Sequence, residues 1–185
     1  MTMTFQHDDL PLALYSAAQV RDLDARLIAA GTPGFELMQR AAHAAWRALR
    51  RRWPEVAALT VLAGHGNNAG DGYLIAALAQ RAGWRVRVLA VAAPQRLAGD
   101  AAQAHAAALA TGVVVEPWSE CAVLEGVVVD ALLGTGLAGA VREPFAQAIR
   151  LANAGDPPVL AGGLPSRWTA PARAGLRGVI GGGLR

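Results

Sequence analysis

The sequence lacks lysine altogether, contains a single cysteine, and has few aromatic residues (5%). Without lysine it cannot build a Walker-type phosphate loop or form a Schiff base, because both need the lysine amine. The single Cys121 cannot form an intramolecular disulfide or, by itself, a zinc site of the usual kind, and it fits a reducing compartment. These absences exclude several large classes of enzyme.

Long apolar runs are also absent, since no run approaches the roughly 18 residues that a membrane-spanning helix needs. The N-terminal segment carries Asp8 and Asp9 and does not have the basic and apolar regions of a signal peptide. We therefore expect a soluble, cytoplasmic protein with no membrane partner. All 17 basic residues are arginine, which explains a pI near 10 at a net charge of only +3. That balance is weak evidence for nucleic acid binding, and no nucleic acid partner is expected.

The chain, with 185 residues of which 54% are hydrophobic, is long enough for one domain with a buried core. Apolar residues at helical spacing predict two N-terminal helices, one ending near Gly31 and one following Pro33 and Gly34. Beyond them, short apolar runs alternate with helical patterns. The predicted strands are 58–64, 86–91, 113–115, 127–130 and 159–161, and the predicted helices are 71–82, 100–112 and 144–155. This alternation indicates an α/β fold with a mainly parallel sheet and helices on both faces.

The strongest local signal is the turn GHGNNAGDG at residues 64–72, where a predicted strand passes into a helix. Glycines allow a tight turn and close approach to a ligand, and a helix N-terminus offers unpaired N–H groups to an anion such as a phosphate. A turn that only packs strand on helix explains the same pattern equally well. The turn by itself therefore leaves a phosphate-bearing ligand and a structural role open.

An ordinary nicotinamide dehydrogenase is disfavoured by the residues that follow this turn. Such a site places an acidic residue about 20 residues on, at the end of the second strand, to hold the ribose hydroxyls. Here no acidic residue lies between Asp71 and Asp100, and the glycine spacing is GxGxxxG, not GxGxxG. The two Asn and the Asp of the turn also supply more side-chain oxygen than a phosphate cradle needs.

A second polar turn follows the strand VVVDA, in which Asp130 precedes the segment LLGTGL at residues 132–137. Loops at the carboxyl ends of neighbouring parallel strands converge on one crevice, where ligands bind. Taken alone, Asp130 is as well explained by a hydrogen bond to a backbone amide. Together the two turns predict a shared site.

The two turns, with YSAAQVRDLD (15–24) and ELMQRAA (36–42), resemble the YjeF N-terminal domain, the NAD(P)H-hydrate epimerase family, over about 14–161. The resemblance implies a Rossmann-like three-layer αβα sandwich, often dimeric. It implies epimerisation of the R and S forms of hydrated NADH and NADPH for cofactor repair, with a separate dehydratase as functional partner. A homodimer is accordingly expected.

The resemblance also implies particular site residues. Both turns would hold the hydrated cofactor, and a potassium ion would be bound by Asn68, Asp130 and Ser166. The residues that would contact the hydrated cofactor are Asn67, Asn68, Ala69, Gly70, Asp71, Gly134, Thr135, Gly136, Leu137, Ala138, Gly139 and Ala140. Ala69 replaces a glycine that is common in the family.

One family motif is altered in this chain. The family has Asp-hydrophobic-Pro-Ser-Gly, whose Asp contacts the hydrated nicotinamide, and the matching residues here run from Gly163 to Arg167, with Gly163 in place of that Asp. The catalytic group is therefore not identified, and Asp71 is a candidate. Two hypotheses stay open: an epimerase, impaired by the loss of this Asp, or a catalytically inactive module of the same fold that binds a ligand or RNA.

Composition changes abruptly near the end of the chain. The last 29 residues, from Pro157, hold no acidic residue, four Arg and seven Gly. We predict a YjeF N-terminal domain over 1–161 and an aberrant, poorly ordered tail over 162–185. A shifted reading frame or an equivalent truncation would explain such a tail, and the other two frames of the coding DNA should then restore a DxPSG-like segment near codon 163.

Overall fold

The computed structural model describes residues 17–134, 141–161 and 178–180. Its helices are α1 (Ala17–Ala29), α2 (Gly34–Arg52), α3 (Asn67–Arg81), the short 3-10 helix η2 (Pro94–Arg96), α4 (Gly99–Ala110) and α5 (Phe145–Ala154). Its strands are β1 (Ala58–Ala63), β2 (Arg85–Ala90), β3 (Val114–Pro117), β4 (Val127–Ala131), β5 (Val159–Ala161) and β6 (Gly178–Ile180).

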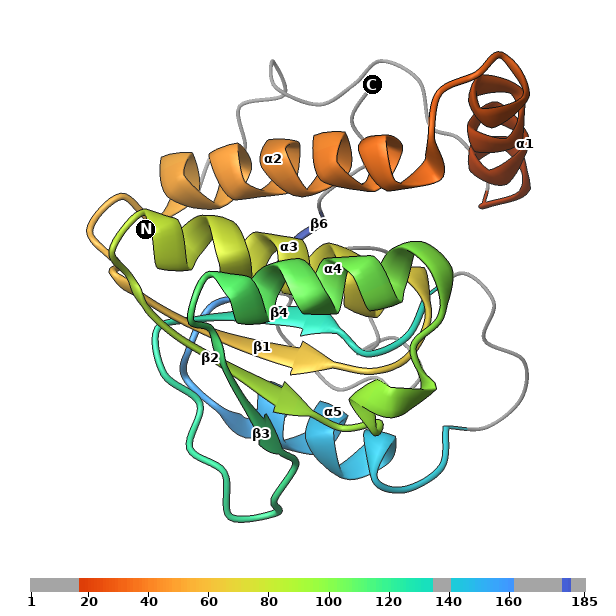
Figure 1. Cartoon of the computed structure of the whole chain (residues 1–185). Coiled ribbons are helices and arrows are strands. Elements are labelled where there is room, and N and C mark those ends of the chain that lie inside the picture. The colour runs from red at the N-terminus through yellow and green to blue at the C-terminus, as the bar shows by residue number, and fades with distance from the viewer. Residues whose placement is uncertain (1–16, 135–140, 162–177, 181–185) are drawn as a thin grey trace, which may run out of the picture.

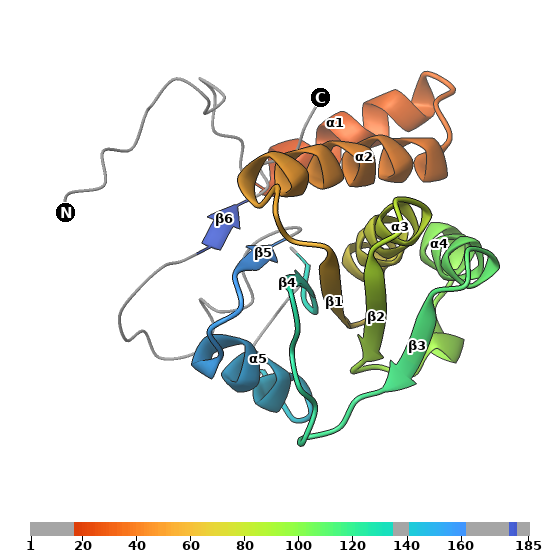
Figure 2. The ribbon, with the colours of Figure 1, turned by 90° about the vertical axis from the view of Figure 1, so that its left-hand side faces the viewer.

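The described strands form one sheet in the order β3-β2-β1-β4-β5-β6, with every pair parallel. Helices α2, α3 and α4 cover one face and α5 lies on the other (Figure 1). The turned view separates these layers and places α1 beside α2, away from the sheet (Figure 2). The predicted three-layer αβα sandwich with a parallel sheet and two N-terminal helices is confirmed.

Alternation along the strands builds a core on each face of the sheet. Residues such as Val61, Val88 and Val129 point toward α2, α3 and α4, whereas their neighbours Leu62 and Leu89 point toward the α5 face. The central strands β1 and β4 are buried along their whole length. Strands covered on both faces are expected to be continuous apolar runs, which is why the sequence shows them so clearly.

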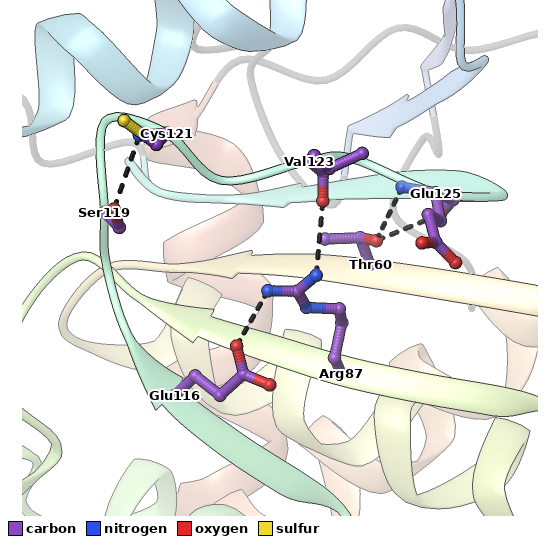
Figure 3. A network of polar contacts seen from close by, with 7 residues as sticks. All are labelled: Thr60, Arg87, Glu116, Ser119, Cys121, Val123 and Glu125. Atoms are coloured by element: carbon purple, nitrogen blue, oxygen red, sulfur yellow. Dashed lines mark hydrogen bonds and ion pairs between the residues drawn. The ribbon is translucent and has the colours of Figure 1, made fainter.

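On the α5 face, a polar network holds the 118–126 segment against the sheet (Figure 3). Arg87 on β2 pairs with Glu116 on β3 at 2.7 Å and donates to the carbonyl of Val123 at 3.4 Å. Thr60 Oγ1 on β1 donates to the Glu125 carbonyl at 2.9 Å and accepts from the Glu125 N–H at 3.1 Å. Thr60 and Arg87 lie in the amino-terminal halves of β1 and β2, whereas Glu116 is the third of the four residues of β3.

Two helix starts differ from the sequence prediction. Helix α3 begins at Asn67, four residues before the predicted Asp71, because Gly66 takes a positive φ of 77° and turns the chain early enough for the NNAGD residues to form its first turns. Helix α4 begins at Gly99, so Asp100 lies inside its first turn. In α3 the earlier start places the polar side chains of Asn67 and Asn68 in the first turn of the helix.

Part of the predicted tail is described. Strand β6 lies within 162–185 and pairs with β5 in parallel register, with Val159 beside Gly178. The other residues of the tail, Gly163 and Ser166 among them, lie outside the described residues. The division at 161 therefore stays a prediction. None of the described helices is both long enough and apolar enough to cross a membrane.

Candidate functional site

The carboxyl ends of β1 and β4 lie side by side at one edge of the sheet. The strands are neighbours in parallel register, with Leu62 beside Asp130 and Ala63 beside Ala131. The N–H of Gly64, the first residue after β1, donates to the Ala131 carbonyl at 3.0 Å. The two polar turns therefore begin at adjacent points, as parallel pairing requires.

A side-chain hydrogen bond joins the two turns. The amide nitrogen of Asn68, in the first turn of α3, donates to the carbonyl of Leu133 at 2.9 Å. A Cβ placed on Gly134 would lie 3.6 Å from the Cβ of Asn68, which is an ordinary van der Waals distance, so the two segments lie close together there. In the part of each turn that it describes, the structure brings residues 67–71 and the segment after Asp130 into contact. That they share one ligand site stays a prediction.

Glycine at position 64 is needed for this close approach. A Cβ at that position would overlap the carbonyl oxygen of Leu132 and lie 2.9 Å from a ring carbon of Phe145. Phe145, at the start of α5, also packs edge-on against the exposed ring of His65, with ring centroids 5.6 Å apart. His65 therefore lies at the rim of the site.

The first turn of α3 presents backbone donors to this edge of the sheet. The first residues of a helix have N–H groups without intrahelical partners, and the helix dipole adds partial positive charge there. In α3 these residues are Asn67, Asn68 and Ala69, and Gly70 then closes the turn through its N–H to the Gly66 carbonyl at 3.2 Å. This arrangement binds phosphate oxygens well.

Asp130 contributes a buried carboxylate to the same corner. Its side chain is 4% exposed, and one of its oxygens accepts from the N–H of Leu132 at 3.3 Å. Because Asn68 uses its amide nitrogen toward Leu133, its amide oxygen is the atom left to accept or to coordinate. A carboxylate and an amide oxygen are both oxygen donors of the kind that suits a hard cation.

Asp71 lies one turn into α3 and is partly buried. Burial, and then the nearby carboxylate of Asp24 on α1, raise the pKa of Asp71 to about 7. A carboxyl group with that pKa gains and loses a proton near neutral pH. The sequence did not predict the contribution of Asp24, because it depends on how α1 packs and no motif marks it.

The remaining predicted site residues lie outside the described residues. They are Thr135, Gly136, Leu137, Ala138, Gly139 and Ala140 of the second turn, together with Gly163 and Ser166. A shallow depression lined in part by Thr60, Arg87 and Glu125 lies at the opposite, amino end of β1 and β2. It takes no part in the site.

Comparison with known proteins identifies the family that the sequence resembles. Residues 34–177 match the family described as YjeF-related protein N-terminus. The chain is similar to a "Bifunctional NAD(P)H-hydrate repair enzyme Nnr" of Coxiella burnetii, with 42% identity over 154 residues, 83% of this chain and 32% of the relative. Its similarity to the Escherichia coli protein of that name is 41% over 150 residues, 79% of this chain and 28% of the relative.

A third relative is of comparable length. The "NAD(P)H-hydrate epimerase" of Rhodobacter capsulatus is 35% identical over 174 residues, which cover 89% of this chain and 82% of the relative. By contrast, the chain spans about a third of the bifunctional relatives. The crystal structure of the yeast protein ynu0 (YNL200c) superposes with a TM-score of 0.71 at 22% identity, over 84% of this chain and 71% of that one, and shows the same fold.

Proposed function

The chain belongs to the family of YjeF-related protein N-termini, and on that basis we propose that it interconverts the R and S epimers of hydrated NADH and hydrated NADPH. The observation that carries the proposal is the hydrogen bond from Asn68 to Leu133. It joins the helix start that we propose binds phosphates to the segment that follows β4, the strand that bears the buried Asp130. Relatives named for NAD(P)H-hydrate epimerisation or repair match across both turns.

Binding of the hydrated cofactor would use the first turn of α3. The diphosphate would accept hydrogen bonds from the backbone of residues 67–70. Residues 134–140, which follow β4 in the sequence, would supply further contacts to the hydrated cofactor. Held between two turns on a rigid sheet, the hydrated ring would keep a fixed orientation relative to Asp71, which is the condition for efficient proton transfer.

Epimerisation requires the hydroxyl group to leave the hydrated ring carbon and to return on the other face. In our proposal Asp71 delivers the proton with which the hydroxyl departs as water, and it receives a proton when water adds to the opposite face. The overall reaction consumes no oxidant, reductant or net proton. A carboxyl group whose pKa is about 7 can act in both directions at neutral pH.

Potassium is the ion we propose for the corner between the turns. The buried Asp130 carboxylate and the amide oxygen of Asn68 fit a hard cation. Ser166 would add a hydroxyl oxygen. When bound, the ion would neutralise the buried charge and order the two turns. Asp130 and Asn68 would hold it, and proton transfer would remain with the protein side chains.

The proposed partners follow from the relatives. Two of them are named bifunctional repair enzymes and extend well beyond the region that this chain matches. We propose that a separate ATP- or ADP-dependent dehydratase consumes the epimer that this chain produces. We also propose a homodimer.

Gly163 favours a second candidate function. Because the family Asp is replaced there, a catalytically inactive module that binds the hydrated cofactor or another ligand, such as RNA, is the alternative.

The deciding experiment follows conversion of pure R-hydrate to the S-hydrate by the purified chain and by Gly163→Asp. Turnover by the unchanged chain supports the epimerase. Ligand binding without turnover, with turnover gained in Gly163→Asp, supports the inactive module. Absence of both binding and turnover contradicts both candidates.

A further inference from the structure

The carboxyl ends of β1 and β2 also lie side by side in the sheet (Figure 1). Ala63 lies beside Ala90, and the N–H of Val91 donates to the Ala63 carbonyl at 2.8 Å. The chain leaving β2 therefore starts directly next to Gly64 and the start of α3. A ligand anchored by its phosphates on α3 has the end of β2 as its neighbour.

This sheet has the strand order of a dinucleotide-binding Rossmann fold, 3-2-1-4-5-6. In that arrangement the adenosine ribose lies over the end of the second strand, and the residues there select between the two nicotinamide cofactors. An acidic residue accepts from the free 2′-hydroxyl, whereas an arginine pairs with a 2′-phosphate. The charge at the end of β2 is therefore informative about the substrate.

The segment that leads from β2 to α4 carries no carboxylate before Asp100 and includes an arginine in η2. No acidic residue lies between Asp71 and Asp100. The carboxylate of Asp100 points away toward α2, since it occupies the space that a Cβ on Gly34 would take. Arg96, the last residue of η2, is exposed, and no residue in the described part of the chain makes an ion pair with it.

The backbone holds Arg96 in place. The N–H of Arg96 donates to the Ala93 carbonyl and the N–H of Leu97 to the Pro94 carbonyl, each at 3.0 Å. Pro94 fixes the first residue of η2, and η2 packs against α4. The guanidinium therefore projects from a rigid turn and is not carried on a free loop, which reduces the entropy lost when it pairs with an anion.

We propose that Arg96 binds the 2′-phosphate of hydrated NADPH and makes this chain selective for hydrated NADPH over hydrated NADH. The proposal rests on the proposed function and specifies its substrate. A planar guanidinium forms paired hydrogen bonds with a phosphate, and the segment between β2 and Asp100 carries no carboxylate to oppose that charge. Glu116, which lies beside Leu89 on the neighbouring strand, pairs with Arg87. With hydrated NADH, which has only a hydroxyl at this position, the interaction is lost.

The test compares both hydrates and two adenosine probes. The chain, Arg96→Gln and the control Arg81→Gln are assayed for epimerisation of each hydrate, and binding of adenosine 2′,5′-bisphosphate and adenosine 5′-monophosphate is measured by calorimetry. Arg81 is a suitable control because it is an exposed arginine at the far end of α3. A reciprocal variant, Ala93→Asp, introduces an acid after β2.

We expect the unchanged chain to prefer hydrated NADPH, and the bisphosphate probe, by roughly tenfold or more, as for a hydrogen bond between charged groups. Arg96→Gln should remove that preference by raising the KM for hydrated NADPH. Ala93→Asp should shift the preference toward hydrated NADH, and Arg81→Gln should keep it.

Equal use of both hydrates by the unchanged chain overturns the proposal while the epimerase function stands. So does an Arg96→Gln variant whose preference between the two hydrates is unchanged. If neither hydrate turns over, the epimerase function fails, and the ratio of the two probes alone decides whether Arg96 reads the phosphate.

Discussion

The side-chain amide of Asn68 donates a 2.9 Å hydrogen bond to the carbonyl of Leu133, and this bond ties the first turn of α3 to the segment after β4. Asn68→Ala removes the bond and one proposed potassium ligand. Only one part-buried hydrogen bond is lost, so we expect the free energy of unfolding to fall by about 1 kcal/mol. Activity should fall much further, because a small displacement of a binding turn costs roughly 100-fold.

Steady-state kinetics measure the loss of activity in Asn68→Ala, and urea unfolding measures its loss of stability. Gln103→Ala is the matched control, since it removes an exposed amide from α4. It should leave both quantities unchanged. Equal activity of the two variants would show that the Asn68 bond does not hold the site together.

Asp71 should make stability depend on pH. Its pKa is raised from 3.8 to about 7, so between these values the folded state binds a proton that the unfolded state has lost. The contribution of Asp71 to stability is therefore greatest below pH 3.8, falls by on the order of a few kcal/mol as the pH rises from there to about 7, and is level above it. Asp71→Asn should remove this dependence and be more stable than the unchanged chain at pH 8.

Urea unfolding at pH 5 and pH 8 measures this difference. Asp24→Asn provides a second check, because it removes the nearby charge and should weaken the dependence in part. Parallel stability curves for the unchanged chain and Asp71→Asn would contradict the raised pKa. In the assay of epimerisation, Asp71→Asn should also lose turnover at every pH.

The strands and the meeting of the two turns were predictable from the sequence. Buried parallel strands appear as continuous apolar runs, and β1 was predicted as 58–64 and observed as Ala58–Ala63. Parallel strands bring their carboxyl ends to one edge, so Asp130 and the Asn-rich turn had to converge. Local patterns determine these features.

Features that depend on tertiary packing were not predictable. The early start of α3 depends on the positive φ of Gly66, and the environment of Asp71 depends on where α1 places Asp24. Strand β6 has only three residues, Gly178–Ile180, which is too short to show a period, and it is defined by its pairing with β5.

Asp130→Asn tests the proposed potassium ion. The amide keeps an acceptor for the Leu132 N–H but removes the negative charge. We expect the activity of the unchanged chain to rise to saturation as potassium is added to a choline buffer. The variant should need a roughly tenfold higher potassium concentration to reach half of its maximal activity, because the charge of the ligands sets cation affinity. Activity that does not depend on potassium in either protein would contradict a potassium site.

Gly64→Ala should destabilise the protein and the site together. The added Cβ would overlap the Leu132 carbonyl and press on Phe145, so β1 and β4 would have to separate. A loss of about 1–3 kcal/mol is expected for overpacking of this kind. Gly134→Ala is the matched control for stability, since its Cβ would be 3.6 Å from Asn68, an ordinary contact. A smaller loss in Gly64→Ala than in Gly134→Ala would contradict the observed packing.

Thr60→Val separates stability from activity. Thr60 is fully buried, and its hydroxyl exchanges two hydrogen bonds with the backbone of Glu125 at the amino end of β1 (Figure 3). Valine has nearly the same shape, but it leaves that N–H and carbonyl without their partner. The expected cost is about 1–3 kcal/mol, seen as a lower Tm and a lower urea midpoint.

The matched control is Thr111→Val, which loses one local hydrogen bond to the Ala108 carbonyl at the end of α4. Its cost should stay below about 1 kcal/mol. Because Thr60 lies in the amino-terminal half of β1 and its hydroxyl bonds the backbone of Glu125, away from the two turns, kcat and KM of Thr60→Val should match those of the unchanged chain at a temperature where both are folded. A selective loss of kcat in Thr60→Val would mean that the amino end of the sheet takes part in the reaction, and the site would then have to extend beyond the two turns.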